Sequence, residues 1–208
     1  AWVDVDGDAL PDLLEGQPGA WRHRRNLGGR VLAEWTDLPN APTAAIGPAA
    51  RFADLTGDGV QDLLERPGQG DAFIFLGDGA APFNHSAELT LDVSFDLADP
   101  RVALVDLNLD GRVDILHHGD GDGWALLQRW DGPGFDPAEP VPPPPAGLRL
   151  GDPGVQLADM DGDRLPDLVR IIPTDSRVLV ATSGGLGIFA DPIDMTGVPT
   201  MTEQDRWE

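Results

Sequence analysis

Four segments of this chain repeat the same spacing of acidic residues. They begin at Asp4, Asp54, Asp106 and Asp159 and read DVDGDALPDLL, DLTGDGVQDLL, DLNLDGRVDIL and DMDGDRLPDLV. The starts lie about 50 residues apart, and a repeat of this length is typical of folds built from one supersecondary unit per repeat. This repeat constrains the fold more strongly than the overall composition does.

The residues around each acidic segment follow a shared plan of short apolar stretches. One stretch precedes the loop, a second opens from the last Asp of the loop, and a third follows before a glycine-rich turn. Short runs of β-branched and aromatic residues bounded by Gly, Pro and Asp are typical of strands. The third strands are expected at Trp21–Asn26, Phe73–Phe75, Trp124–Gln128 and Val178–Ala181. With a more irregular fourth strand, each repeat has the size of a β-propeller blade of four antiparallel strands.

The chain is therefore predicted to be all-β, with residues 1–208 forming one propeller segment of four blades. The expected blades span about residues 1–48, 49–100, 101–153 and 154–203. Residues 204–208 match the start of a next blade, because Trp207 stands where Trp2 and Phe52 stand before their loops. We expect the natural protein to continue into a larger propeller of about seven blades. Closure of four blades alone, or of a pair of chains, is the alternative.

A proline-rich segment, residues 137–145, interrupts the repeats with the sequence PAEPVPPPP. Consecutive prolines lack N–H donors for a sheet and favour an extended polyproline conformation. We interpret the segment as a stiff surface loop that lengthens one blade connection. The alternative is a docking peptide for a partner with an aromatic groove.

The acidic loops follow the pattern D-x-[DNT]-x-D-x-x-x-D, which predicts calcium sites. Ca²⁺ takes about six to eight oxygen ligands from carboxylates and backbone carbonyls. Side chains at loop positions 1, 3, 5 and 9, with the carbonyl of position 7, can turn toward one ion. The predicted ligands are Asp4, Asp6, Asp8, the Leu10 carbonyl and Asp12; Asp54, Thr56, Asp58, the Val60 carbonyl and Asp62; Asp106, Asn108, Asp110, the Arg112 carbonyl and Asp114; and Asp159, Asp161, Asp163, the Leu165 carbonyl and Asp167. About four Ca²⁺ ions are expected, one per blade.

An EF-hand, a magnesium site, a zinc site and a plain turn each fit the loops less well. An EF-hand needs a Glu at position 12 and flanking helices, Mg²⁺ demands octahedral geometry, and Zn²⁺ favours Cys and His ligands. Asp and Gly also form turns, but four copies of one ligand register argue against turn formation alone. Crowded carboxylates repel one another, so binding should couple to folding and the sites are interpreted as structural. Loops one and four carry four carboxylates and rank above loops two and three, which have Thr56 and Asn108.

Charge and composition exclude several classes of function. The net charge is −22, which argues against nucleic acid or an anionic membrane as a partner. The chain has no Cys and no apolar stretch long enough to span a membrane. It also lacks the G-x-S-x-G, P-loop and H-E-x-x-H motifs, so no enzyme activity is expected.

Three further features each allow two interpretations. The basic run from Trp21 to Arg25 is interpreted as a solvated strand face, with an acidic partner or neighbouring blade as the alternative. His117 and His118 before a GDGDG run are interpreted as the start of a hairpin turn, with an extra metal site as the alternative. Trp21 and Trp124 stand at matching third-strand positions, which favours blade packing over stacking on sugars.

The loops, the apolar pair after each and the later glycine-rich turn resemble FG-GAP (VCBS-type) repeats. Those repeats are the calcium-binding blades of integrin α-subunit heads, certain fungal and bacterial lectins and many secreted bacterial proteins. The segment VQLADMDGDRLPDLVRI is similar to repeats in the B component of insecticidal toxin complexes and related virulence-plasmid toxin proteins. In that family the propeller helps to form, or attaches to, a shell around a toxic cargo.

The resemblance implies a non-enzymatic, calcium-stabilised module for protein binding or assembly in a larger bacterial exported or toxin-complex-like protein. Its partner would be another protein or the remaining blades of the same protein, outside the cell or on its surface. One alternative is a glycan-binding lectin or adhesin. A second is an accessory domain of a secreted hydrolase. Neither nucleic-acid binding nor membrane insertion is expected.

Overall fold

The computed structural model describes residues 1–38, 42, 46–47, 50–66, 72–77, 83, 85–89, 95–120, 125–130, 132 and 134–201. Trp124, Gly121–Gly123 and the expected start of a further blade at 204–208, including Trp207, lie outside these residues. Within them, the regular structure is all strand apart from one short 3₁₀ turn, Pro173–Asp175. No described helix is long and apolar enough to cross a membrane.

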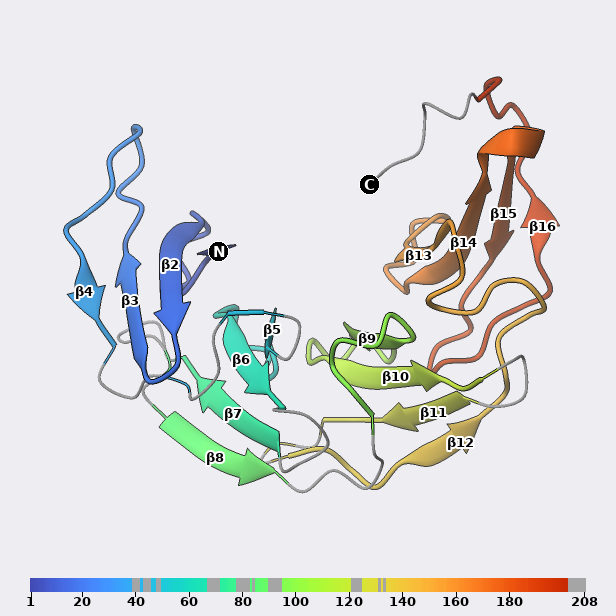
Figure 1. Cartoon of the computed structure of the whole chain (residues 1–208). Helices are drawn as coiled ribbons and strands as arrows, with labels where there is room; N and C mark the ends of the chain where they lie inside the picture. Colours follow the sequence, from blue (N-terminus) through green and yellow to red (C-terminus); the bar gives the residue numbers. More distant parts are fainter. Residues whose placement is uncertain are drawn as a thin grey trace. The chain divides into compact units, whose positions relative to one another are not determined.

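The strands form four sheets, each a meander of four antiparallel strands in chain order (Figure 1). The first sheet contains β1 (Trp2–Val3), β2 (Asp12–Gln17), β3 (Ala20–Arg24) and β4 (Thr36–Asp37). The second contains β5 (Ala50–Ala53), β6 (Asp62–Glu65), β7 (Ala72–Leu76) and β8 (His85–Leu89). The third contains β9 (Val102–Val105), β10 (Asp114–His118), β11 (Ala125–Gln128) and β12 (Glu139–Val141). The fourth contains β13 (Val155–Ala158), β14 (Asp167–Ile172), β15 (Arg177–Ala181) and β16 (Ile193–Asp194).

These sheets confirm the predicted all-β class and the four blade-like repeats. Each acidic loop lies between the first and second strands of its sheet, as expected. The third strand of the first repeat ends at Arg24 rather than at Asn26, which instead forms an isolated bridge with Leu32 across the glycine-rich turn.

The proline-rich segment differs from the expectation of a loop alone. Within it, β12 pairs with β11 through Ala125↔Val141 and Leu127↔Glu139. This strand is the last of its sheet and needs hydrogen bonds on one side only, so Pro140 is tolerated there. The segment therefore supplies the fourth strand of the third sheet.

The described chain divides into two compact units. The first comprises Ala1–Asp99, Gly111–Val113 and Arg129–Pro137, and the second comprises Pro100–Asp110, Asp114–Gln128 and Ala138–Glu208. Each unit has its own apolar core, formed between the facing sides of two sheets. The cores hold the acidic loops in place through the strands that flank them.

The core of the first unit centres on Trp21 of β3. This side chain is 1% exposed and packs against Leu14 and Leu63 in one cluster. Its ring lies 6.1 Å from Phe83 in an edge-on contact and 6.3 Å from Phe52. Trp21 therefore serves blade packing, as its position in the repeat predicted.

The core of the second unit is aliphatic. Leu116 of β10 and Leu127 of β11 pack with Leu168 of β14 and Ala181 of β15, and all four are almost fully buried. The cross-strand pairs Leu116↔Leu127 and Leu168↔Ala181 lie one position apart in the shared register. Because strand residues alternate between the two faces of a sheet, the pairs lie on opposite faces of their sheets, which face one another in this core.

Strand β3 of the first sheet carries charged residues where β7, the third strand of the second sheet, carries aromatic ones. The registers Leu13↔Arg24 and Leu63↔Phe75 align Arg24 with Phe75, and therefore Arg22 with Phe73. Phe73 and Phe75 pack into the core of the first unit, whereas Arg22 is exposed. This side of the first sheet is consequently polar.

Candidate metal centres

All four acidic loops adopt the same backbone conformation. Positions 4 and 6 have positive φ in every copy; these residues are Gly7 and Ala9, Gly57 and Gly59, Leu109 and Gly111, and Gly162 and Arg164. A left-handed conformation costs a non-glycine residue about 1 kcal/mol. Leu109 and Arg164 adopt it nonetheless, with φ of 61° and 75°. The repeated sequence therefore encodes one repeated loop geometry.

The first Asp of each loop closes the turn through its side chain. Asp4 accepts hydrogen bonds from the N–H groups of Gly7 and Ala9 at 2.8 and 2.9 Å. Asp159 accepts the equivalent bonds from Gly162 and Arg164 at 2.7 and 3.0 Å. Asp54 and Asp106 accept the same position-4 N–H, at 2.7 Å in both loops. The first carboxylate is thus fixed at the centre of its loop.

Positions 3 and 5 are held by shorter-range hydrogen bonds. Asp8 accepts the Leu10 N–H at 2.9 Å, and Asp58 and Asp163 accept the matching N–H groups in their loops at 2.9 and 2.8 Å. In loop three the Asn108 oxygen accepts the Asp110 N–H at 2.9 Å, while its amide nitrogen donates to Asp110 Oδ2. Each of these side chains bonds to backbone two residues further along, which aligns its oxygens within the loop.

The ninth residue has a second role that the ligand pattern did not reveal. These residues are Asp12, Asp62, Asp114 and Asp167, all with no exposed surface. In each, one oxygen accepts the N–H of loop position 2, at distances from 2.8 to 3.2 Å. In three of them the other oxygen accepts an N–H just after the third strand, from Asn26, Gly77 or Ser183. The ninth carboxylate therefore joins the loop to the far end of the adjacent hairpin.

Burial makes these ninth carboxylates electrostatically costly. Desolvation raises the pKa of Asp62 to about 6, although backbone N–H groups of Gly77 and Leu55 oppose the shift. Desolvation also raises the pKa of Asp12, against hydrogen bonds from Asn26 and Val5. A nearby divalent cation would stabilise the ionised form of such a buried carboxylate.

The loops bring together oxygen donors that suit a hard cation. Carboxylate oxygens of Asp4, Asp6 and Asp8 all lie within 4.8 Å of one another, as do those of Asp159, Asp161 and Asp167. These groups lie in loops one and four, the two that rank highest by sequence. In the part of the chain with described placement, loops two and three form no such three-carboxylate group.

Loop two gives a different indication that its donors suit a cation. Thr56 Oγ1, at the third ligand position, is buried and finds no hydrogen-bond partner among the described residues. A buried hydroxyl without a partner is costly, and coordination of a cation would satisfy its oxygen. The donor chemistry of the loops therefore fits Ca²⁺. The other predicted ligands are the remaining loop carboxylates, including Asp62 and Asp114, the Asn108 side chain and the position-7 carbonyls of Leu10, Val60, Arg112 and Leu165.

The basic run after Trp21 is used inside its own repeat. Arg22 donates to Glu15, and Arg24 donates to the carbonyl oxygens of Ala33 and Leu32. Arg25 forms an ion pair with Asp6. These contacts agree with a strand face held by local contacts more closely than with a free basic patch for an acidic partner.

His117 and His118 belong to β10, where both are buried. His118 Nδ1 accepts the Leu150 N–H at 3.0 Å, and burial lowers the pKa of this imidazole to about 4. Neither histidine belongs to a group of metal-ligating side chains in the described regions. The two histidines end a strand before the next one begins, as a hairpin requires.

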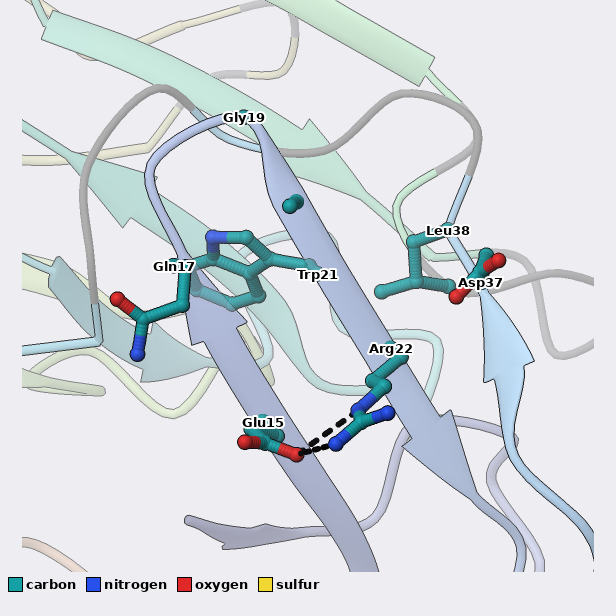
Figure 2. Close-up of a pocket in the computed structure, with 8 residues that line it drawn as sticks. Glu15, Gln17, Gly19, Trp21, Arg22, Asp37 and Leu38 are labelled. Carbon is teal, nitrogen blue, oxygen red and sulfur yellow. Dashed lines mark hydrogen bonds and ion pairs between the residues drawn. The ribbon is translucent and has the colours of Figure 1, made fainter.

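A cavity of about 500 Å³ lies along β2, β3 and β4 of the first sheet (Figure 2). Its described lining residues are Glu15, Gln17, Gly19, Ala20, Trp21, Arg22, Asp37 and Leu38. Arg22 bridges the wall by donating from Nε and Nη2 to Glu15 Oε2, at 2.8 and 2.6 Å. The same guanidinium lies 4.4 Å from the ring centroid of Trp35, a cation–π contact.

Comparison with known proteins supports the repeat assignment. A family described as FG-GAP-like repeat matches residues 4–65 and 106–170, more than half of the chain. Comparison with curated proteins finds no match.

Two solved structures resemble this fold closely. A lectin from Agrocybe aegerita, described as recognising non-reducing terminal N-acetylglucosamine, has a TM-score of 0.71 at 21% identity over 99% of this chain. The Photorhabdus luminescens Tc holotoxin pore has a TM-score of 0.67 at 23% identity over 99% of this chain. The chain spans 53% of the lectin chain and 10% of the toxin chain. At these identities the likeness concerns the fold.

Proposed function

Since the chain belongs to the FG-GAP-like repeat family, we propose that it is a non-enzymatic, calcium-stabilised propeller module that binds or assembles with other proteins. The observation that carries the metal part is the recurrence of one loop geometry, with positive φ at positions 4 and 6 and oxygen donors at 1, 3, 5 and 9. Four independent turns would not need to share this register.

Calcium would act as a structural ion. In each loop the carboxylates lie a few residues apart and carry like charges, which repel one another in the folded state. A divalent cation converts that repulsion into attraction and ties the first strand of a sheet to the second. Because an unfolded chain does not preform such a site, the binding free energy adds to folding stability.

Thermal unfolding with Ca²⁺ and with a chelator tests this proposal directly. We expect the chelated protein to melt many degrees lower, and Mg²⁺ at equal concentration to restore less of the loss, because Mg²⁺ retains its water shell. Two single variants, Asp4→Ala in loop one and Asp163→Ala in loop four, should each reduce the rise in melting temperature that calcium causes. Identical melting temperatures in Ca²⁺ and chelator would contradict the proposal.

The assembly role is supported by the composition of the loops and by the fold likeness to a toxin-complex protein. The predicted ligand carboxylates are engaged in loop hydrogen bonds, and no catalytic motif accompanies them at a fixed spacing. The likeness to part of a Tc holotoxin chain supports a module within a larger bacterial exported or toxin-complex-like protein. Binding of the module to the remaining parts of its own protein, measured with purified segments in Ca²⁺, tests this role.

Glycan binding is the second candidate, and the cavity on the first sheet favours it. Carboxylates of Glu15 and Asp37, the Gln17 amide and a neighbouring Trp35 offer planar polar groups and an aromatic surface, the combination that suits a polyhydroxyl ligand. The fold likeness to a lectin points the same way. A glycan array in Ca²⁺, with Asp37→Ala as the comparison, would establish this function by sugar binding that the variant loses. The absence of any binding would leave the assembly role.

A further inference from the structure

The third ligand position of loop one forms an ion pair with a positively charged side chain from outside the loop. Arg25 lies directly after β3 and donates from Nε to Asp6 Oδ2, forming an ion pair with the third ligand position of the loop. The Asp6 side chain is 8% exposed, whereas the Arg25 side chain is 53% exposed. The guanidinium therefore covers the carboxylate from the solvent side.

The matching position is uncharged in two of the other repeats. Leu13, Leu63 and Leu168 each follow the ninth residue of their loop, and they pair with Arg24, Phe75 and Ala181. The next residue along the chain is therefore Arg25 in the first repeat, Leu76 in the second and Thr182 in the fourth. Neither of these residues carries a charge. In the third repeat the register Ile115↔Gln128 aligns it with another arginine, Arg129, which forms an ion pair with Asp136 at 3.9 Å.

We propose that Arg25 is an internal counter-cation that lowers the calcium affinity of loop one. The inference rests on the proposed function, since it assumes that loops one and four bind Ca²⁺. When no ion is bound, the guanidinium partly compensates the carboxylates of Asp4, Asp6 and Asp8. When Ca²⁺ binds, the same positive charge repels the ion and competes with it for an Asp6 oxygen.

The consequence is an order of affinity that the carboxylate count does not give. Loops one and four both carry four carboxylates. Of these two loops, only loop four has an uncharged residue, Thr182, at the position that corresponds to Arg25. Loop four also has Arg164 at its sixth position, but that side chain is exposed and forms no ion pair in the described part of the chain. Loop four is therefore expected to fill at lower calcium than loop one, although both loops carry the same number of carboxylates.

Site-resolved calcium titration tests this order. The amide signals of Gly7 and Gly162 lie inside loops one and four, so NMR spectra of the labelled chain report the two sites separately. We expect Gly162 to reach half-saturation at lower Ca²⁺ than Gly7. The variant Arg25→Leu, which places the residue of the second repeat in the first, should shift the Gly7 midpoint about three- to tenfold toward lower calcium.

A second readout separates the two effects of Arg25. In chelator, Arg25→Leu should melt below the wild type, because loop one loses its compensating charge. In saturating Ca²⁺ the difference should shrink or reverse. The polar variant Arg25→Gln should behave as Arg25→Leu does, and Arg25→Lys, which keeps the charge, should stay close to the wild type.

A control comes from an arginine of similar exposure on the fourth sheet. Arg177 pairs with Asp194, which is not a predicted ligand, and Arg177→Leu should leave both calcium midpoints unchanged. An unchanged Gly7 midpoint in Arg25→Leu, with both loops still titrating, would overturn this inference alone. If neither Gly7 nor Gly162 responds to calcium in the wild type, the proposed function and this inference both fail.

Discussion

Substitution of Asp167 tests whether the ninth loop residue stabilises the fold independently of any metal. Its side chain is fully buried, and its two oxygens accept the N–H groups of Met160 at 2.8 Å and Ser183 at 2.7 Å. A hydrogen bond to a charged group contributes about 1.5–3 kcal/mol. Asp167→Ala removes two and leaves the buried N–H of Ser183 and the partly buried N–H of Met160 without this partner. We therefore expect it to lower the free energy of unfolding by about 3–6 kcal/mol.

The measurement is denaturant unfolding in the presence of a chelator, so that loss of a metal ligand does not contribute. Asp163→Ala is the matched control, because Asp163 lies in the same loop, is exposed and accepts the Leu165 N–H at 2.8 Å. It should cost about 1 kcal/mol. Asp167→Asn retains one acceptor oxygen and should fall between the two. If Asp167→Ala and Asp163→Ala destabilise the chelated protein equally, the structural role assigned to the ninth residue is wrong.

The remaining predictions concern the core and the loop backbone. Burial lowers the pKa of His118 from about 6.5 in the unfolded chain to about 4 in the folded one, so folding stability should be lost as the pH falls from about 6.5 through 4. In a His118→Gln variant the free energy of unfolding should depend less steeply on pH over this range. An equally steep dependence would contradict this. Gly57→Ala should destabilise more than Gly59→Ala in thermal melts, because both have positive φ but only the Cβ at 57 meets the Gly111 oxygen, at 2.9 Å. Trp21→Ala should cost about 3–5 kcal/mol in denaturant unfolding, since it opens a cavity among packed rings; a cost below about 1 kcal/mol would show that the core collapses to fill it.

The strand order and the loops were predictable because their signals are local. Each loop and the strands that flank it lie within a short stretch of sequence, and four copies reinforce one another. Three features were not predictable, since each depends on pairing between distant residues. Pro140 becomes part of a strand only because β11 offers it one free edge, and Asp167 meets Ser183 only once the hairpin between them has formed. The contact of Arg25 with Asp6 likewise requires β2 and β3 to bring the two together.

The same hydrogen bonds bear on which side-chain ligand position varies among the four repeats. Positions 1, 5 and 9 are Asp in every copy, whereas position 3 is Asp, Thr, Asn and Asp. The first and ninth carboxylates each hold backbone N–H groups that would otherwise lose their partners. Position 3 holds only the N–H of position 5, which a neutral Asn108 oxygen also accepts at 2.9 Å. In loop two, where Thr56 stands, that N–H bonds to Asp54 instead, at 3.1 Å. A bound cation would need an oxygen at position 3 but not a charge, so both the backbone and the cation would tolerate a neutral side chain there.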